Sequence, residues 1–498
     1  MINDLSRFIV LPSRGLLATV ESASNSQRRF LNDVGAVKSV TAARSFAKDL
    51  GIDMGEGAFR VIDSMFDEGA KLIEMTAEVA NKMKANEPGL RIVPLLKYKP
   101  AMSVAEIARK VKASVAGVGI AVKTVVTVLS KVDGKPLREA RVVAFTDYGE
   151  AEGAEGITNS KGEVKLSLGS AEKIERLYVY GPVGFWGYFA KNLPREAVSV
   201  SIEPVNLGVD DCLRTMYKPL NPNDGKGITV GVVDTGIGPH SDLKVDGGAN
   251  TVKGESSFAD NGLGHGTHVA GIIAARGAAP TGMGGIAPAV TLRSYRVFPK
   301  GEGEADNFAI SQAIGKAVAD GCDLINLSLV VGEIDPALTS AVYHARQHGT
   351  LVFAANGNDG RKSVSYPASD GLCIAVSALG VKGTYPAKSS EDGDVLKPFG
   401  TNPAEFVAAF SNIGGETDLA GPGVGVISTL PGGYGPMSGT SMACPAVTGF
   451  AARLLALHPE LTSMPRDNNR SDAMARAVML AASRRGFESK YVGNGVPA

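Results

Sequence analysis

The chain has few cysteines, no excess of charge and no long apolar run. Its four cysteines are scattered without a CxxC pair, which argues against a disulfide scaffold or a cysteine-rich zinc site. Lys+Arg and Asp+Glu both number 51, so we expect no nucleic-acid partner and no anionic membrane partner. Because no run of about 18 apolar residues occurs, we also expect no membrane span.

The first residues do not have the pattern of a secretory signal. Residues 1–8 contain an early acid and are not followed by a long apolar core. Cys322 and Cys373 lie in or beside apolar runs, and we interpret them as reduced core residues. We therefore expect a cytoplasmic protein, with secretion as the alternative if a leader had been removed from the chain.

The length of 498 residues exceeds what one hydrophobic core supports, so we expect several domains. Residues 1–100 predict a βαββαβ order, which is typical of a ferredoxin-like α+β unit. Residues 101–115 have the composition of a linker with some helical character. Residues 116–205 contain short alternating strands separated by turns, which predicts a small β-sandwich. The strands and helices expected in the first unit cover 8–11, 24–50, 59–62, 71–75, 77–85 and 91–96.

Residues 206–498 have an α/β pattern. Nearly continuous apolar strands suit a parallel sheet with helices on both faces. The expected strands cover 228–233, 290–297, 323–330, 351–355 and 373–379. The expected helices cover 265–275, 305–320, 336–347, 441–457 and 471–483. The predicted fold class is therefore α/β, a parallel sheet flanked by helices, preceded by the ferredoxin-like domain and the small β-sandwich.

Two residues near the start of this part have the positions of catalytic groups. Asp234 directly follows a strand, where functional groups of open α/β sheets collect, although an aspartate there can also cap a loop. His265 stands between glycines at the expected start of a helix. His268 follows three residues later, but a third zinc ligand at suitable spacing is missing, so we expect no zinc and interpret His268 as a structural neighbour.

Two further residues complete a chemical set. Ser441 lies in the first turn of a buried helix after a Gly-containing loop. A serine is a good nucleophile only when a base takes its proton and donors receive the oxyanion. Asn358 follows the strand 351–355, and its amide could be such a donor, although asparagine is also common in turns.

Together these residues carry a resemblance. Asp234-Thr235-Gly236, the run His265–Gly271 and the run Gly439–Ala443 occur in that order, with Ala354–Asn358 between the last two. Over residues 206–498 the chain resembles the subtilisin-like serine proteases, or subtilases.

The resemblance implies roles for these residues. Ser441 would be the nucleophile, His265 the general base and Asp234 the group that orients the imidazole, in one hydrogen-bonded relay. Asn358 and the Ser441 N–H would bind the oxyanion. The strand 323–329 resembles the family's substrate-binding edge, beside which a peptide would add as a further strand. The expected substrate-binding residues are Ser328, Leu329, Val330 and Gly357. Val330 and Val331 stand where the family usually has two glycines, which argues against bulky aromatic side chains in the cleft.

The resemblance also extends to the N-terminal unit. Residues 1–100 resemble the family's inhibitory propeptide, so the chain's own N-terminal domain would be an intramolecular inhibitor; a separate ferredoxin-like domain is the alternative. Self-processing would cut near Pro100-Ala101 or within 206–226. The sandwich resembles transthyretin-like or carboxypeptidase-regulatory modules, with an inactive immunoglobulin-like spacer as the alternative.

We expect no required cofactor and no metal. Asp242 matches a calcium-ligand position of the family, but residues 276–288 lack an oxygen-rich loop, and a single acid is a poor site for Ca²⁺. Calcium is therefore possible but unsupported.

Three other classes share part of this pattern. An aspartic protease needs a second Asp-Thr-Gly triplet, which is absent, and an α/β-hydrolase esterase needs its histidine after the serine, where only His458 stands. The third is a catalytically silent peptide-binding scaffold with the subtilase fold. We predict a serine endopeptidase acting on protein or peptide substrates and made as a self-inhibited, self-processed precursor.

Overall fold

The structure is a computed structural model, and it describes most of the chain. The described residues are 5–11, 59–65, 69–86, 90–102, 112–113, 123–169, 171–196, 198–218 and 221–498. The helix expected at 24–50 and most of the linker 101–115 lie outside them. In these residues no helix combines the length and the apolarity needed to cross a bilayer. All four cysteines are buried and unpaired.

The N-terminal unit is a four-stranded antiparallel sheet in the order β2-β3-β1-β4, which is the strand order of ferredoxin-like folds. β3 is buried over most of its length, and Ile9, Val10 and Leu11 at the end of β1 are all fully buried. The elements are β1 (Ser6–Leu11), β2 (Phe59–Ser64), β3 (Lys71–Met75), α3 (Ala77–Asn86) and β4 (Arg91–Pro94).

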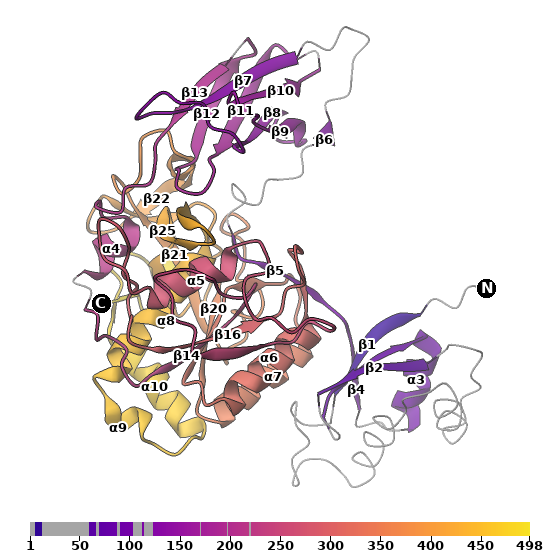
Figure 1. Ribbon diagram of the computed structural model, residues 1–498. Coiled ribbons are helices and arrows are strands. Elements are labelled where there is room, and N and C mark those ends of the chain that lie inside the picture. Colours follow the sequence, from indigo (N-terminus) through magenta and orange to yellow (C-terminus); the bar gives the residue numbers. More distant parts are fainter. Residues whose placement is uncertain are drawn as a thin grey trace.

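A short strand follows that the sequence did not predict. β5 (Lys97–Pro100) does not join the N-terminal sheet. It pairs antiparallel with β17 (Ala305–Asp306) on one side and β19 (Leu329–Val330) on the other. In Figure 1 it runs away from the N-terminal unit along the edge of the largest domain.

The middle of the chain forms a β-sandwich. One sheet has the order β10-β7-β13 and the other β12-β11-β8-β9-β6, and apolar side chains such as Val128 and Leu177 fill the space between them. Four strands that the sequence pattern missed belong to these sheets, namely β9, β12, β13 and the two-residue β6, which lies within the expected linker 101–115. The elements are β6 (Lys112–Ala113), β7 (Lys123–Ser130), β8 (Arg141–Asp147), β9 (Glu152–Ile157), β10 (Glu163–Ser167), β11 (Lys173–Tyr180), β12 (Tyr188–Pro194) and β13 (Val198–Ile202).

The C-terminal domain is built on a large, mostly parallel sheet, so the α/β fold class is confirmed. Its strand order is β15-β16-β14-β18-β20-β21-β23-β22, with β24 also paired to β21, and only β23 runs against the others, pairing antiparallel with both β21 and β22. The strands are β14 (Thr229–Asp234), β15 (Gly247–Asn250), β16 (Thr291–Arg296), β18 (Leu324–Leu327), β20 (Leu351–Ala355), β21 (Ile374–Val381), β22 (Val395–Phe399), β23 (Glu405–Ala408) and β24 (Leu419–Pro422).

The remaining elements of this domain cover or extend the sheet. Aspartates begin α6, α7 and α10, where their side chains accept backbone N–H groups as N-caps. The elements are α4 (Cys212–Tyr217), α5 (His265–Ala274), α6 (Asn307–Ala319), α7 (Pro336–Gln347), η1 (Ser390–Asp394), β25 (Val426–Leu430), β26 (Gly433–Met437), α8 (Thr440–Ala456), α9 (Pro459–Thr462), α10 (Asn468–Leu480), β27 (Ala482–Ser483), α11 (Ser489–Val492) and β28 (Val496–Pro497).

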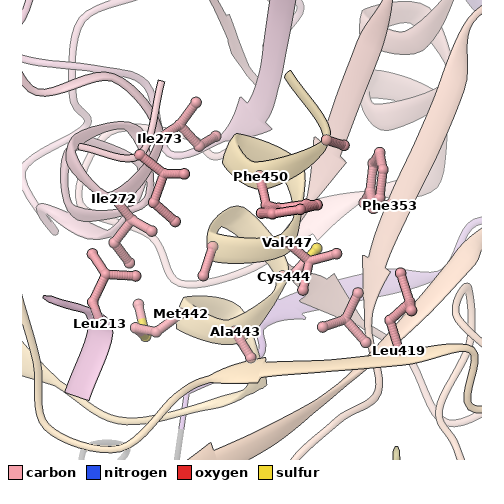
Figure 2. Close-up of a cluster of buried hydrophobic side chains, with 14 of the residues drawn as sticks. Leu213, Ile272, Ile273, Phe353, Leu419, Met442, Ala443, Cys444, Val447 and Phe450 are labelled. Carbon is pink, nitrogen blue, oxygen red and sulfur yellow. The ribbon is translucent and has the colours of Figure 1, made fainter. Parts of the chain in front are cut away.

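The two faces of the sheet bury different helices. On one face, α5, α8 and α10 pack over residues such as Phe353 and Leu419. On the other face, α6 and α7 pack over residues such as Ile325 and Val352. Figure 2 shows the first of these cores, with Met442, Ala443, Cys444, Val447 and Phe450 of α8 packed between α5 and the sheet. This packing fixes α8, and its first turn carries Ser441.

The expected strand 323–330 is interrupted. Residues Leu324–Leu327 pair in the parallel sheet, whereas Leu329–Val330 leave it to pair with β5. Ser328 lies between the two pairings, and its carbonyl is therefore free to accept hydrogen bonds at the sheet's carboxyl edge.

Candidate active site

The residues singled out from the sequence meet at the carboxyl edge of the parallel sheet. Asp234 is the last residue of β14, and Asn358 lies three residues past the end of β20. His265 begins α5, and Ser441 is the second residue of α8. Parallel strands and the helices that follow them bring such groups to one edge.

Asp234 and His265 form a buried pair. Asp234 Oδ1 lies 2.7 Å from His265 Nδ1, and both side chains are almost completely buried. Because the carboxylate can only accept, Nδ1 is the donor, which fixes the tautomer and leaves Nε2 as the basic nitrogen. Nε2 is buried and has no hydrogen-bond partner.

Two glycines allow this approach. Gly264, just before the helix, adopts a left-handed conformation with φ of 77°. At Gly266 a Cβ atom would lie 2.4 Å from the carbonyl oxygen of Gly236, so only glycine lets the first turn of α5 approach β14 so closely.

Ser441 makes a different contact from the one we expected. Its Oγ donates to the Ser328 carbonyl oxygen at 3.0 Å, so the predicted bond to His265 is not formed in this state. Hydrogen bonds between catalytic groups are often long or misaligned before a substrate complex tightens them. Within the described residues, one bond of the expected relay is thus unformed, the one between Ser441 Oγ and His265 Nε2.

The donors for an oxyanion are also arranged here. The Asn358 Oδ1 atom accepts the Thr440 N–H at 2.9 Å, and this bond turns the amide so that Nδ2 is the free end. Nδ2 is buried and without a partner. The Ser441 N–H donates to the carbonyl oxygen of Ala101 at 3.0 Å.

The segment 97–101 lies against the same edge. Pro100 pairs with Leu329 and Lys99 with Val330, and the Ala101 N–H donates to the Ser328 carbonyl at 3.0 Å. Ala101 is itself buried. Ser328, Leu329 and Val330 thus bind a segment of the chain's own backbone in the strand-addition mode.

Gly357, the other expected substrate-binding residue, uses its backbone groups within the domain. Its N–H donates to Thr440 Oγ1 at 3.1 Å, and its carbonyl accepts from the Asn412 N–H at 2.8 Å. Both backbone groups are therefore occupied within the domain, and they hold the loop after β20 against the start of α8.

Tyr98 anchors the bound segment. Its side chain is fully buried, and its hydroxyl donates to Asp335 Oδ2 at 2.9 Å. Burial raises the pKa of this phenol, so the hydroxyl stays protonated and remains a donor. Asn307 also holds the backbone beside it, because its Oδ1 accepts the Leu96 N–H at 3.1 Å.

Several supporting residues had no role in the sequence analysis. Thr235 Oγ1 accepts the Gly266 N–H at 2.8 Å. Asp260 accepts the N–H groups of Gly262 and Gly264 at 2.8 and 2.9 Å, which orders the loop ahead of His265. Thr235 was visible in the Asp234 motif, whereas nothing in the sequence pattern marked Asp260.

Asp242, the candidate calcium ligand, is bonded to protein donors. Its Oδ2 accepts the Met283 N–H at 3.0 Å and the Tyr434 hydroxyl at 2.8 Å. Across the residues that the structure describes, no cluster of three His, Cys, Asp or Glu side chains has the arrangement of a metal site.

Comparison with known proteins identifies the family. A family model described as the subtilase family matches residues 225–495. That is more than half of the chain. The chain belongs to the subtilase family.

Named relatives agree with the family match. The chain is 38% identical to subtilisin BL from Lederbergia lenta over 246 residues, which cover 49% of this chain and 82% of that protein. It is 39% identical to subtilisin DY from Bacillus licheniformis over 245 residues, 48% of this chain and 80% of that protein. A thermostable alkaline protease from Halalkalibacterium halodurans is 36% identical over 273 residues, 55% of this chain and 66% of that protein.

These findings make the protein a subtilisin-like serine endopeptidase, as the sequence predicted. The aspartic-protease, esterase and silent-scaffold alternatives receive no support. The family model matches residues 225–495, a range that includes neither the N-terminal unit nor the sandwich.

His268 is a structural part of this subtilase site with a consequence for stability. The imidazole is fully buried, its Nε2 lies 3.0 Å from the Val426 carbonyl and 3.1 Å from the Gly435 carbonyl, and Nδ1 has no partner. Nε2 is therefore the donor, and a second proton would add a charge at a buried nitrogen without an acceptor. Burial lowers the pKa of His268 to about 3.

We expect acid to destabilise the protein through this histidine. His268 takes up a proton near pH 6.5 in the unfolded chain and only near pH 3 in the folded chain. Its contribution to the free energy of unfolding is therefore complete above pH 6.5 and falls as the pH drops below that value. At pH 5 the loss is about 2 kcal/mol. Thermal unfolding of an inactive Ser441→Ala chain at pH 7 and pH 5 measures it.

Variants of two histidines separate this effect from other acid effects. His268→Gln should reduce the change in Tm between the two pH values. His458→Gln, at an exposed imidazole, should leave that change as it is. An equal pH dependence in the His268→Gln and unsubstituted backgrounds would contradict the assignment.

Proposed function

We propose that this endopeptidase is made as a self-inhibited precursor that cuts its own chain between Ala101 and Met102, using Asp234, His265 and Ser441. The observation that carries the proposal is the 3.0 Å hydrogen bond from the Ser441 N–H to the Ala101 carbonyl oxygen. In acyl transfer, the carbonyl under attack points its oxygen at such a donor. In the alternative region 206–226, the residues that the structure describes make no comparable contact with the Ser441 N–H.

The proposed reaction follows from the groups around that carbonyl. Ser441 Oγ attacks the carbonyl carbon of Ala101, and its proton passes to His265 Nε2. The Ser441 N–H and the Asn358 Nδ2–H stabilise the negative charge on the carbonyl oxygen by donating hydrogen bonds to it. The bond to the Met102 nitrogen then breaks, and His265 returns the proton to that amine. Water attacks the acyl-enzyme in the same way and leaves a carboxylate on Ala101.

Asp234 supports both proton transfers. Its carboxylate accepts the His265 Nδ1–H at 2.7 Å, so it stabilises the imidazolium that forms when Nε2 takes up the serine proton. Because the pair is buried, this attraction is weakly screened by water.

The same contacts support an inhibitory role for the N-terminal unit. β5 pairs with strands on both sides. Tyr98, three residues before Ala101, has a fully buried side chain. A substrate adding as a strand to β19 needs the backbone groups that β5 already uses. After the cut, residues 1–101 would block the cleft until they dissociate or are degraded.

The local fit predicts a preference for small side chains before the cleaved bond. Ala101 is 1% exposed and packs in the main core of the domain, so a larger side chain has no room without shifting its neighbours.

We expect Ala101→Trp to slow self-cleavage by about 10- to 100-fold, because overpacking a filled site costs roughly 1–3 kcal/mol. Ala101→Gly should keep cleavage at the same bond. Gel analysis of the fragment 102–498 over time, with its N-terminus sequenced, measures both. Ala77→Trp, at an exposed position of the N-terminal unit, is the matched control. If Ala101→Trp were processed at the rate of the unsubstituted chain, Ala101 would not be the residue directly before the cleaved bond.

A further inference from the structure

The bond proposed for cleavage opens onto a pocket that two domains share. Met102 follows Ala101, so it lies on the leaving-group side of the carbonyl bonded to the Ser441 N–H. Met102 is partly buried and borders a pocket of about 260 Å³. The pocket therefore lies where the side chain after a cleaved bond would be.

One wall of this pocket comes from the β-sandwich and the other from the catalytic domain. The sandwich contributes the turn from Tyr180 to Phe185, and the catalytic domain contributes Leu430, Pro436 and Met437 of the β25–β26 hairpin. The two walls lie close together, because a Cβ added to Gly433 of the hairpin would lie 3.2 Å from a methyl carbon of Val183.

The sandwich wall is held firmly. Trp186, the single tryptophan of the chain, directly follows this turn and is buried against Met283 and Ile427 of the catalytic domain. The Phe189 N–H donates to the Lys388 carbonyl at 2.9 Å across the same boundary. A buried tryptophan supplies a large area of apolar contact, so the turn is fixed relative to Ser441.

The lining suits an apolar side chain. Most of its side chains are carbon-rich, and the two charged ones are already bonded. Arg141 donates to Glu155 at 2.6 Å, and Glu391 accepts the Ser390 hydroxyl at 3.1 Å. The volume is below the roughly 300–1,000 Å³ of small-molecule sites, which suits one side chain rather than a whole ligand.

We propose that the β-sandwich is a specificity element, and that its Tyr180–Phe185 turn and the β25–β26 hairpin bind an apolar side chain of methionine or leucine size directly after the cleaved bond. Met102 is then the residue that the chain itself presents to this pocket. The inference rests on the proposed cleavage between Ala101 and Met102.

The test compares peptides that differ only after the cleaved bond. Internally quenched peptides carry Tyr-Lys-Pro-Ala before the bond and either methionine or glycine after it, and the processed enzyme is used. We expect kcat/KM to favour methionine at least about tenfold, because glycine leaves the pocket unfilled. Val183→Glu puts a carboxylate into the apolar wall and should bring the ratio of the two kcat/KM values close to one.

The control and the outcomes separate this inference from the cleavage proposal. Val132→Glu, at a valine 78% exposed elsewhere on the sandwich, should keep the preference of the unsubstituted enzyme. An equal methionine preference in Val183→Glu, or no preference in the unsubstituted enzyme, would overturn the inference while leaving self-cleavage intact. Mapping of self-cleavage to another bond would overturn the register and this inference with it.

Discussion

Ser441→Ala should give a chain that stays at its full length of 498 residues and hydrolyses peptides on the order of 10⁶-fold more slowly, the size of the effect that loss of the nucleophilic serine has in subtilisin. The variant lacks the hydroxyl that would attack Ala101. It keeps the backbone N–H that binds the Ala101 carbonyl, so the N-terminal unit should remain docked. Intact mass and peptide hydrolysis measure the two results.

The matched control for this variant is Ser463→Ala, at an exposed serine, which should process and hydrolyse like the unsubstituted chain. Normal processing of purified Ser441→Ala at Ala101 would show that another protease makes the cut, and self-processing would have to be abandoned.

Asp234→Asn should lower kcat by about 10⁴, the size of effect found when the aspartate of another serine protease is replaced by asparagine. The change keeps the shape of the side chain but removes the buried charge. It can also present an amide N–H to His265 Nδ1, which reverses the donor and acceptor of the 2.7 Å bond. Nε2 would then carry the proton and could not take another from Ser441. Steady-state kinetics and the rate of labelling by a fluorophosphonate measure the loss.

A surface aspartate provides the comparison. Asp472→Asn removes an exposed ion pair with Arg346, which is worth at most about 1 kcal/mol, so kcat should be unchanged. If Asp234→Asn labelled as fast as Asp472→Asn, His265 would not depend on Asp234 for its tautomer.

Much of the C-terminal domain could be predicted from sequence because its signals are local. The apolar run before Asp234 predicts a buried strand, and the expected strand 351–355 has the same bounds as β20. The glycines around His265 indicate that the start of α5 packs closely against its neighbours. At Gly266 a Cβ atom would lie only 2.4 Å from the Gly236 carbonyl oxygen, so no larger residue fits there. Such positions are set by backbone geometry that short motifs encode.

The parts that were missed depend on partners far away in the chain. β5 is only four residues long and ends in a proline, so its sequence gives a weak strand signal, and it is held as a strand by its pairing with β17 and β19. β9 is rich in glycine and glutamate, so its pairing with β8 is not marked by strand propensity. The orientation of Ser441 Oγ depends equally on a distant group, since the Ser328 carbonyl lies 113 residues away.

The role of the sandwich shows the same limit. Its strands were recognised in part from their alternation, but nothing local indicated that the turn before Trp186 faces the catalytic domain. That contact is made by Met283 and Ile427, which have the appearance of ordinary core residues in the sequence. Domain boundaries follow from composition, whereas domain contacts depend on surfaces that only the fold brings together.

One measurement tests the central claim most directly, namely that Ser441 attacks the carbonyl of Ala101. The purified chain is incubated alone, treated with a fluorophosphonate and analysed by mass spectrometry. The account predicts two fragments, residues 1–101 and residues 102–498, with the phosphonyl group on Ser441 of the larger one. An uncut chain, a cut at a different bond, or the label on another residue would contradict it.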